Sequence, residues 1–540
     1  MQSEIIDDSF FAALAEFMSW MNDPRKDVRD VESGHLLTRV ATATPEDVQE
    51  AFLKARTSQE VWRSMRAFGR SKVFARFANS LWRYQEEITA VSQMLGGKSR
   101  FDANEEFLDI VSTVRMVTKY SMKMFKRRRG GGGLPFSSWR VIHRPLGTVG
   151  IFTSPDWPLS SLCDVIQALA AGNAVMNFVT PQSALGAVLL HAMLTDAGMP
   201  YGLWKIIPAS TSEPGRSIIP GLDIVSVLGS DRLGYRISKS CEAAGVPFRG
   251  FLGVENVGVI MDDCKLDHAV RAIARAGFQG AGQTVTSTEA IFVHEDIFAE
   301  FSSQLKDFVE DQVTIGALQD INTTLGSMLN VERARTLQKK VDEALELGAH
   351  LLTGGHRRPD IGEAFFEPTI LTDISKDSNI YNEEVHGPLI YLIPFSDLSE
   401  VAGYLGASRH IYTVYLFTRS EPIMTDFIAS VEASALVIND SYMSLYSVWQ
   451  APIQGGKDTG SGIRHGVESI LQYSRIQSLS RQLFHPWVSD TLTPDNRVDF
   501  NRFRIERLML WIYTYFTDTP PAYAIRGAIR RLKYRLSGPV

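Results

Sequence analysis

Residues 280–290, GAGQTVTSTEA, have the composition of a loop that brings main chain close to a reacting centre. Small residues lead into a Gly-Gln pair, and hydroxyl side chains follow at Thr284, Thr286, Ser287 and Thr288. A hydroxyl is a weak nucleophile unless a base lies beside it. Val285, in the middle of the loop, offers no reactive group. The stretch therefore has the form of a catalytic loop without an evident catalyst.

Residues 229–234, GSDRLG, indicate a second candidate site, for a phosphate group. They follow the apolar run DIVSVL and open a helical stretch, which places Gly229, Ser230 and Gly234 at a strand-to-helix turn. Glycine there lets the main chain approach a pyrophosphate, and the helix N-terminus presents free N–H groups. A plain strand-to-helix turn without a ligand is the alternative interpretation.

Both motifs lie in a chain that alternates between strands and helices. From residue 148 the segments TVGIFT, NAVMNFV, LWKIIPA and DIVSVLG are typical of strands, and helical patterns follow the first, second and fourth of them. A second alternation runs from about 251 to about 440. This order predicts an α/β fold with mostly parallel sheets, which bind ligands at the carboxyl ends of their strands. Long helices are predicted ahead of it, over about 44–66, 71–96 and 104–125.

Two basic segments stand apart from this pattern. KRRRGGGG (126–133) predicts a solvated, flexible turn, with a phosphate or partner patch as the alternative. Residues 523–536, YAIRGAIRRLKYRL, predict a basic amphipathic helix. Such a helix contacts a membrane surface as a peripheral element or packs on a neighbouring subunit.

Composition excludes several classes of protein. The chain has 540 residues, 44% hydrophobic and 21% charged, with a net charge of −6, so we expect no nucleic-acid binding. The cysteines, Cys163, Cys241 and Cys264, form neither a zinc pattern nor a disulfide framework, and each is expected to be a small buried side chain. With no signal peptide and no long apolar run, we expect a cytoplasmic protein, with membrane contact only at the periphery.

Seven segments, in this order, carry a resemblance to a known family. Over about 35–485 the chain resembles the aldehyde dehydrogenase superfamily, and it is most similar to actinobacterial-type succinate-semialdehyde dehydrogenases that use NADP. The segments are RPLGTVGIFTSPDWPL (144–159), LAAGNAV (169–175), GLDIVSVLGSDRLG (221–234), GAGQTVTS (280–287), TGGHRRPDIGEAFFEPTILTDI (353–374), NEEVHGPL (382–389) and APIQGGKDTGSGIRHGVESILQYSR (451–475).

The resemblance implies covalent catalysis at positions that this chain fills with other residues. In the family a cysteine attacks the aldehyde, an asparagine helps to hold the oxyanion, and a glutamate activates water. The matching positions here are Val285, Asp156 and Phe251. Other family positions are also replaced: the ribose-binding lysine by Phe178, a further lysine by Glu255, the asparagine before the loop by Gly280, and an aromatic residue by His386.

Part of the cofactor site is retained by the same comparison. Gly229, Ser230 and Gly234 keep the pyrophosphate turn, and Glu384 keeps the carboxylate expected at the nicotinamide ribose. The resemblance thus implies NADP or NAD as cofactor, but Phe178 replaces the lysine that binds the cofactor ribose in the family.

The resemblance also implies a domain organisation and an oligomer. The fold class expected is α/β and aldehyde dehydrogenase-like, with a Rossmann-like cofactor domain, an α/β catalytic domain and a small β oligomerisation arm. The predicted parts are an N-terminal helical part of the cofactor domain (1–137), a hairpin segment (138–147), the Rossmann-like domain (148–250), the catalytic-type domain (251–440), a return to the cofactor domain and arm (441–485), and a C-terminal tail (486–540). Segments 138–145 and 470–479 match the arms through which family members form dimers or tetramers.

Two hypotheses about function follow. In the first, favoured by the residues, the chain is a catalytically inactive homologue that acts as a binding, regulatory or structural subunit, in a homo-oligomer or with an active relative. In the second, it remains an oxidoreductase that oxidises a semialdehyde or another aldehyde with NAD(P) by altered chemistry. A Ser287–His386 pair is one arrangement that the second hypothesis could use.

Overall fold

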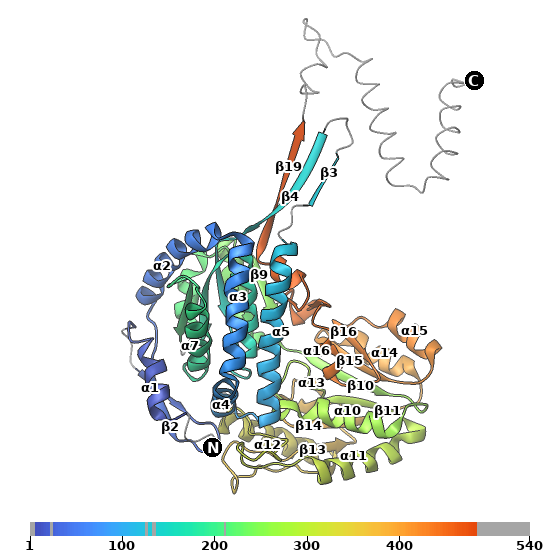
Figure 1. Cartoon of the computed structure of the whole chain (residues 1–540). Helices are drawn as coiled ribbons and strands as arrows, with labels where there is room; N and C mark the ends of the chain where they lie inside the picture. Colours follow the sequence, from blue (N-terminus) through green and yellow to red (C-terminus); the bar gives the residue numbers. More distant parts are fainter. Residues whose placement is uncertain (1–5, 22–24, 125–127, 132–136, 210–211, 483–540) are drawn as a thin grey trace, which may run out of the picture. The chain divides into compact units, whose positions relative to one another are not determined.

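A five-stranded parallel sheet forms the centre of the first half of the chain (Figure 1). Its strand order is β7-β6-β5-β8-β9, and every neighbouring pair is parallel. Strands β5 to β8 are apolar for most of their length and buried throughout, as expected for strands with both faces covered. The strands are β5 (Thr148–Phe152), β6 (Ala174–Val179), β7 (Trp204–Pro208), β8 (Ile224–Leu228) and β9 (Phe248–Phe251).

The helices between these strands confirm the predicted alternation, except that the third of them was not predicted. They are α6 (Cys163–Ala171), α7 (Pro181–Asp196), α8 (Glu213–Ile218) and α9 (Asp231–Ala244). Glycines in left-handed conformation end two of them, Gly172 after α6 and Gly245 after α9. Because glycine lacks a Cβ, it adopts this conformation without strain and lets the chain turn back into the next strand.

A seven-stranded sheet organises the second alternation. Its order is β12-β13-β14-β11-β10-β15-β16, and only the β12–β13 pair is antiparallel. Its strands are β10 (Glu255–Ile260), β11 (Ala290–His294), β12 (His350–Thr353), β13 (Thr369–Thr372), β14 (Leu389–Phe395), β15 (Ile411–Phe417) and β16 (Ala435–Ile438). The helices of this part are α10 (Leu266–Phe278), α11 (Phe298–Gln312), α12 (Val331–Glu346), α13 (Asn379–Asn382), α14 (Leu398–Ala407), α15 (Glu421–Ser430) and α16 (Tyr442–Ser447).

The N-terminal helices follow the predicted pattern with one break. Helix α2 (Pro45–Ser64) begins with the expected capping box between Thr44 and Asp47. The single helix predicted over about 71–96 is instead two, α3 (Arg66–Arg83) and α4 (Gln85–Gly96), joined at Tyr84. Helix α5 (Arg100–Met124) packs along α3 and α4. The break depends on how α3 and α4 pack against α5 and α7, a tertiary requirement that apolar spacing alone does not encode.

A small antiparallel sheet of order β19-β4-β3 belongs to a separate compact unit. It pairs β3 (Arg128–Gly131) with β4 (Ser137–Pro145), and β19 (Ser474–Gln482) lies on the other side of β4. The prediction of a turn over 126–133 is therefore wrong for 128–131. A ladder is made by main-chain groups, so a neighbouring strand rich in aromatic and β-branched residues can hold a glycine-rich segment extended.

The computed structural model describes residues 6–21, 25–124, 128–131, 137–209 and 212–482. The predicted helix at 523–536 lies outside these residues. No helix among them is long and apolar enough to cross a membrane. Cys163, Cys241 and Cys264 are free and buried, as predicted. The remaining described elements are α1 (Asp8–Glu16), β1 (Arg25–Arg29), β2 (Leu36–Ala41), β17 (Ile453–Gln454), β18 (Ile463–Arg464) and α17 (Glu468–Leu471).

Candidate functional site

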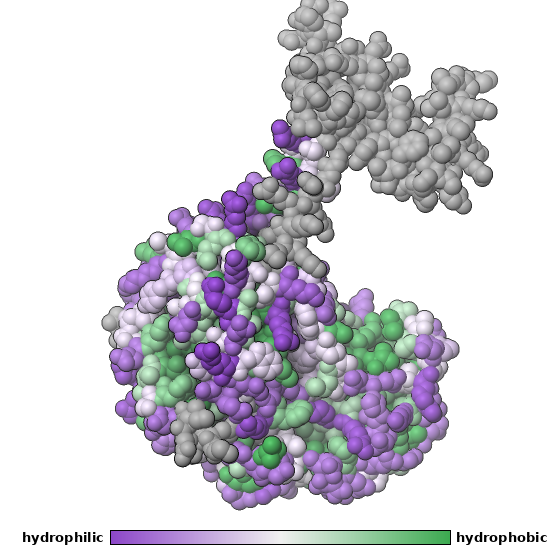
Figure 2. Space-filling view, in the orientation of Figure 1, coloured by the Kyte–Doolittle hydropathy of each residue, from purple (hydrophilic) through white to green (hydrophobic). Residues whose placement is uncertain are grey.

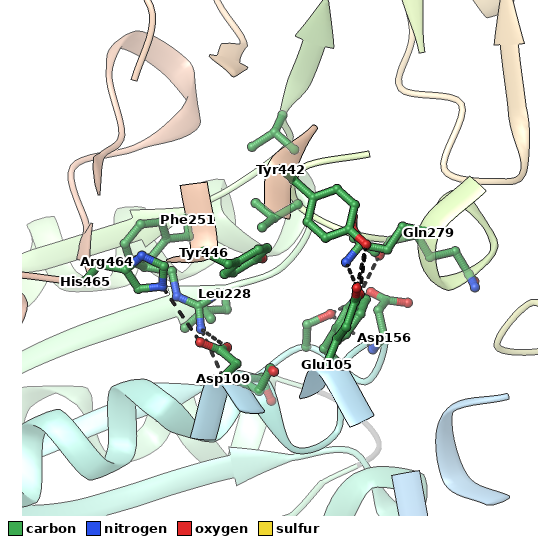
Figure 3. A pocket seen from close by; sticks show the side chains of 18 of the residues that line it. Glu105, Asp109, Asp156, Leu228, Phe251, Gln279, Tyr442, Tyr446, Arg464 and His465 are labelled. Carbon is green, nitrogen blue, oxygen red and sulfur yellow. Dashed lines mark hydrogen bonds and ion pairs between the residues drawn. The ribbon is translucent and has the colours of Figure 1, made fainter. Parts of the chain in front are cut away.

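A cavity of about 540 Å³ lies at the carboxyl ends of β5, β8 and β9. Segments that follow these strands line it, together with the loop after α10 and residues of α5, α12 and α16. Figure 3 shows Glu105 and Asp109, both from α5, facing Tyr442, Arg464 and His465 across it. The cavity therefore has the position expected of a ligand site in a parallel α/β fold. It brings together seven of the family positions singled out in the sequence: Asp156, Gly229, Ser230, Phe251, Val285, Glu384 and His386.

The loop that carries Val285 has a tightly determined main chain. Gly280, Ala281 and Gly282 have φ angles of 54°, 56° and 67°, and a Cβ on Gly282 would lie 1.8 Å from the carbonyl oxygen of Gly387. Gln283 is buried and accepts a hydrogen bond from Leu329 N at 3.0 Å. The loop thus presents a half-buried Val285 to the cavity in one fixed position.

The hydroxyl groups around Val285 are turned away from any base. Ser287 Oγ donates to the carbonyl oxygen of Gly277 at 3.0 Å, and Thr284 Oγ1 donates to Gln279 Oε1 at 3.2 Å. His386 contacts Asp156, Arg333 and Glu384 instead. The Ser287–His386 pair considered above is therefore not formed.

Phe251 closes the side of the cavity at the end of β9. It is 5% exposed, and a Cβ on Gly462 would lie 2.2 Å from its Cε2 atom, so the ring fills the space above that glycine. Its carbonyl oxygen accepts a hydrogen bond from Gly229 N at 3.1 Å. The side chain supplies apolar surface and no group that could activate water.

Asp156 lies in an ion cluster that also contains Arg333, His386 and Glu384, referred to below as the Asp156 cluster. Asp156 Oδ1 contacts Arg333 Nη1 and lies 3.5 Å from His386 Nε2, and His386 Nδ1 lies 3.2 Å from Glu384 Oε1. Burial alone would raise the pKa of Asp156, but the charges of Arg333 and His386 outweigh it and hold that pKa well below its usual range. Asp156 is therefore a carboxylate, which accepts hydrogen bonds and cannot donate one to an oxyanion.

His386 carries a proton in this cluster. Burial would lower its pKa, but the charge of Asp156 and hydrogen bonds to Asp156 and Glu384 raise the pKa of His386 to about 9. The 2.8 Å approach of Arg333 Nη1 to His386 Nε2 is then a contact between two donors that share Asp156. A protonated imidazole cannot act as a general base.

The turn after β8 keeps the form of a phosphate-binding turn. Ser230 caps helix α9, where its Oγ accepts a hydrogen bond from Leu233 N at 3.4 Å. Gly234 lies one turn into the helix and does not line the cavity. A Cβ there would lie 2.2 Å from Leu252, so this glycine permits close packing of α9.

Phe178, at the end of β6, is part of a packed aromatic pair. It is 4% exposed, and its ring stacks on Phe152 with centroids 4.5 Å apart. A Cβ on Gly215 would lie 2.6 Å from Phe152 and 3.1 Å from Phe178. The region is closed by side chains, and Phe178 does not line the cavity.

Residues 20–479 match the sequence profile of the aldehyde dehydrogenase family. The chain belongs to this family. A Mycobacterium ulcerans protein named "Putative succinate-semialdehyde dehydrogenase (NADP+) 2" is 29% identical over 459 residues, 85% of this chain and 88% of the relative. A Mycolicibacterium smegmatis protein named "Putative succinate-semialdehyde dehydrogenase (NADP+)" is 29% identical over 455 residues, 84% of this chain and 88% of the relative.

Solved structures share the fold. The crystal structure of succinate-semialdehyde dehydrogenase from Burkholderia pseudomallei matches with a TM-score of 0.81 at 24% identity, covering 85% of this chain and 95% of that one. An NAD+ complex of aldehyde dehydrogenase from Bacillus cereus matches with a TM-score of 0.79 at 22% identity, covering 85% and 94%. The predicted family and fold class are confirmed.

The residues of this aldehyde dehydrogenase fold fit a nicotinamide cofactor poorly. The α9 N-terminus is present, and the carboxylate of Asp231 in its first turn accepts a hydrogen bond from Gly253 N at 2.7 Å and lies 3.2 Å from His410 Nε2. The Phe152–Phe178 pair offers no polar atom to a ribose hydroxyl. Glu384 is held by His386 at 3.2 Å. The described residues therefore keep the main-chain turn of a cofactor site but lack most of its side-chain contacts.

The cavity also contains two clusters of charged residues that were not predicted as site residues from the sequence. In the Asp109 cluster, Asp109 lies 3.9 Å from Arg464 and 3.7 Å from His465. Burial opposes ionisation of Asp109, but His465 and Arg464 hold its pKa below the usual value. In the Glu105 cluster, Glu105 lies 3.0 Å from Arg275 and accepts from Tyr442 Oη at 2.8 Å.

The sequence points to some of these charged residues and not to others. Arg464 and His465 belong to the segment RHGVESILQYS that carries the resemblance, so their position was open to inference. Arg333, Glu105 and Asp109 sit on helices whose apolar spacing says nothing about charge. Only the tertiary contacts among α5, α12 and the loops bring them to one cavity.

Proposed function

We propose that this chain is a catalytically inactive member of the aldehyde dehydrogenase family that acts as a binding, regulatory or structural subunit. The observation that carries the proposal is Val285, fixed by the Gly-Gln turn at the family's nucleophile position and facing the cavity. Phe251 and Asp156 stand at the base and oxyanion positions and line the same cavity. Loss of a covalent nucleophile alone costs up to about 10⁶ in well-studied hydrolases.

The proposal extends to the cofactor. Gly229, Ser230, Gly234 and Glu384 are its candidate cofactor-binding residues, but the packed Phe178 weakens binding of NADP or NAD. Family members are commonly oligomeric, and we infer that β4 and β19 serve as the oligomerisation arm of this chain, in a homo-oligomer or with an active relative. The domain boundaries near residues 138, 148, 251, 441 and 486 are part of the same proposal.

The direct test combines cofactor binding with turnover. The purified full chain is titrated with NADP and NAD by thermal shift and then assayed with succinic semialdehyde. We expect no turnover and little or no shift. Cofactor-dependent oxidation by the uncontaminated protein would overturn the proposal and establish instead an oxidoreductase with altered chemistry.

Restoring the two replaced residues tests how far the site has changed. Val285→Cys with Phe251→Glu should produce a thiol at position 285 that an alkylating reagent labels, because this position faces the cavity. The wild-type protein is the control, since Cys163, Cys241 and Cys264 are buried. We expect labelling but no recovery of turnover, because the Asp156 carboxylate remains. Recovery of aldehyde oxidation would show that only two side chains separate this chain from an active enzyme.

A further inference from the structure

Part of the cavity wall, beside the charged Glu105 and Asp109 of α5, presents apolar side chains from α5 and α16. Leu108, Ser112 and Met116 line it from α5, at a four-residue spacing that puts them on one helix face. Met443 and Trp449 line it from α16 and the segment that follows. Figure 2 shows hydrophobic surface where α15 lies, outside this wall.

This apolar wall continues to the protein surface. Leu108 is 49% exposed and Met443 is 44% exposed, although both line the cavity. Water contact is unfavourable for such side chains, and a rim of this kind is typical of an entrance for an apolar ligand. Methionine adapts to ligands of different shape because its side chain is unbranched and flexible.

The charged groups of the cavity are matched by one another. In the Asp156 cluster two carboxylates, Asp156 and Glu384, face two cations, Arg333 and His386. In the Asp109 cluster the carboxylate faces Arg464, which also lies near the buried Asp164. In the Glu105 cluster Arg275 is shared with the buried Asp102 at 2.8 Å. Each arginine of the three clusters thus already has a carboxylate partner.

This balance decides which ligand charge the cavity accepts. A carboxylate brought into the cavity gives up its water shell and finds no cation that lacks a carboxylate partner in the three clusters. A cation would likewise compete with arginines for carboxylates that are already bound. An uncharged ligand loses no charged hydration shell and does not compete for ion partners. It gains contact with aromatic surface from Trp157, Tyr446 and Trp449.

We infer that the cavity is a binding site for an uncharged, mainly apolar ligand of the aromatic aldehyde or alcohol class, and that it discriminates against carboxylate-bearing semialdehydes. The inference rests on the proposed function, in which a bound aldehyde is held without being oxidised. It departs from the substrate that the names of the two mycobacterial relatives give, because succinic semialdehyde carries a carboxylate.

Three para-substituted benzaldehydes test this inference by isothermal titration calorimetry on the full chain: para-tert-butylbenzaldehyde, para-(trimethylammonio)benzaldehyde and para-formylbenzoate. The first two differ in charge with almost the same shape. We expect the neutral probe to bind at least about tenfold more tightly than either charged probe. Equal or tighter binding of a charged probe, or no saturable binding of the neutral one, would overturn the inference.

A variant of this wall tests whether an added positive charge increases the affinity for a carboxylate-bearing probe. Ser112→Arg adds a cation to the face of α5 between Leu108 and Met116, three residues after Asp109, a carboxylate that already lies 3.9 Å from Arg464. Ser112→Gln is the uncharged control. We expect Ser112→Arg, and not Ser112→Gln, to raise the affinity for para-formylbenzoate by about tenfold. Unfolding temperatures close to wild type would show that both variants are folded. If the arginine leaves the preference for the neutral probe unchanged, cavity charge does not set selectivity and the inference fails.

The inference and the proposed function fail in different ways. Binding of the neutral probe together with reduction of NADP would overturn the proposed inactivity but keep the ligand class. Preferred binding of para-formylbenzoate without turnover would overturn the ligand class but keep the inactivity.

Discussion

At the scale of single residues, the carboxylate of Asp156 defines this site. Asp156 stands where the family resemblance implies a neutral oxyanion donor, and it recruits Arg333 from α12 and His386 from the loop before β14. A lone buried carboxylate would be costly, so these cations are what make Asp156 tolerable in the fold. The position is stabilised as an ion cluster and has no remaining capacity to donate to an oxyanion.

The protonation of His386 makes stability depend on pH. Its pKa in the folded protein, about 9, lies above the unfolded value of about 6.5. Its contribution is therefore fully present below pH 6.5 and is lost as pH rises through 9. We expect the unfolding free energy to fall by up to about 3 kcal/mol across this interval from His386 alone.

Asp156→Asn isolates this effect. Removing the carboxylate lowers the pKa of His386, so the fall in stability between pH 6.5 and 9 should become shallower in the variant than in wild type. Urea unfolding at several pH values measures the slopes, and the buried Glu289, whose pKa burial and Glu384 raise to about 8, is present in both proteins. Equal slopes would show that Asp156 does not hold the proton on His386.

At the scale of elements, the turn before Val285 has a structural role of its own. Three consecutive positive φ angles carry the chain from α10 into the loop, and Gly387 packs directly against Gly282. This turn fixes the cavity wall and the start of β11, so it has a structural reason to remain without catalysis. The resemblance in main-chain motifs and the loss of reactive side chains are thus compatible.

Gly282→Ala tests this structural role. The new Cβ would meet the Gly387 carbonyl at 1.8 Å, at a φ of 67° that alanine adopts with strain, so we expect a loss of at least about 2 kcal/mol of unfolding free energy. Gly403→Ala in α14 is the matched control, because nothing lies within 4 Å of its added Cβ. There we expect stabilisation of up to about 1 kcal/mol. Thermal unfolding of both variants gives the comparison, and a neutral Gly282→Ala would refute the close packing.

At the scale of the whole molecule, the sheet β19-β4-β3 leaves β19 with a neighbour on one side only among the described strands. Ile476 and Leu479 of this strand are 68% and 48% exposed. A strand edge with apolar side chains is a template for pairing with another chain. This is the physical basis for the proposed oligomer, and it is independent of catalysis.

Ile476→Lys with Leu479→Lys should therefore weaken assembly. We expect wild type to sediment as a dimer or tetramer and the double variant to shift toward monomer, because lysine on an edge opposes strand pairing. Ile321→Lys is the control, since Ile321 is 78% exposed and lies outside this sheet. Analytical ultracentrifugation measures the oligomeric state of each protein. A monomeric wild type would contradict the proposal that β4 and β19 serve as an oligomerisation arm.

The local elements were predictable because their signals are local. The alternation of apolar runs and helical spacing predicted β5 to β8 and the helices α6, α7 and α9, and the Thr44–Asp47 capping box marked the start of α2. The break between α3 and α4 and the strand at Arg128–Gly131 were missed. The strand depends on its pairing with β4, and the break depends on how α3 and α4 pack against α5 and α7.

The sequence by itself determined the family, the order of the elements and the residue types at the family's catalytic positions, because these follow from motifs read along one chain. Only the tertiary structure decided what those residues now do. It showed that Arg333 and His386 neutralise Asp156, that Phe178 is packed on Phe152, and that the arginines of the cavity have carboxylate partners. Charge balance and burial are properties of distances between segments remote in sequence, so they emerge only when the chain is folded.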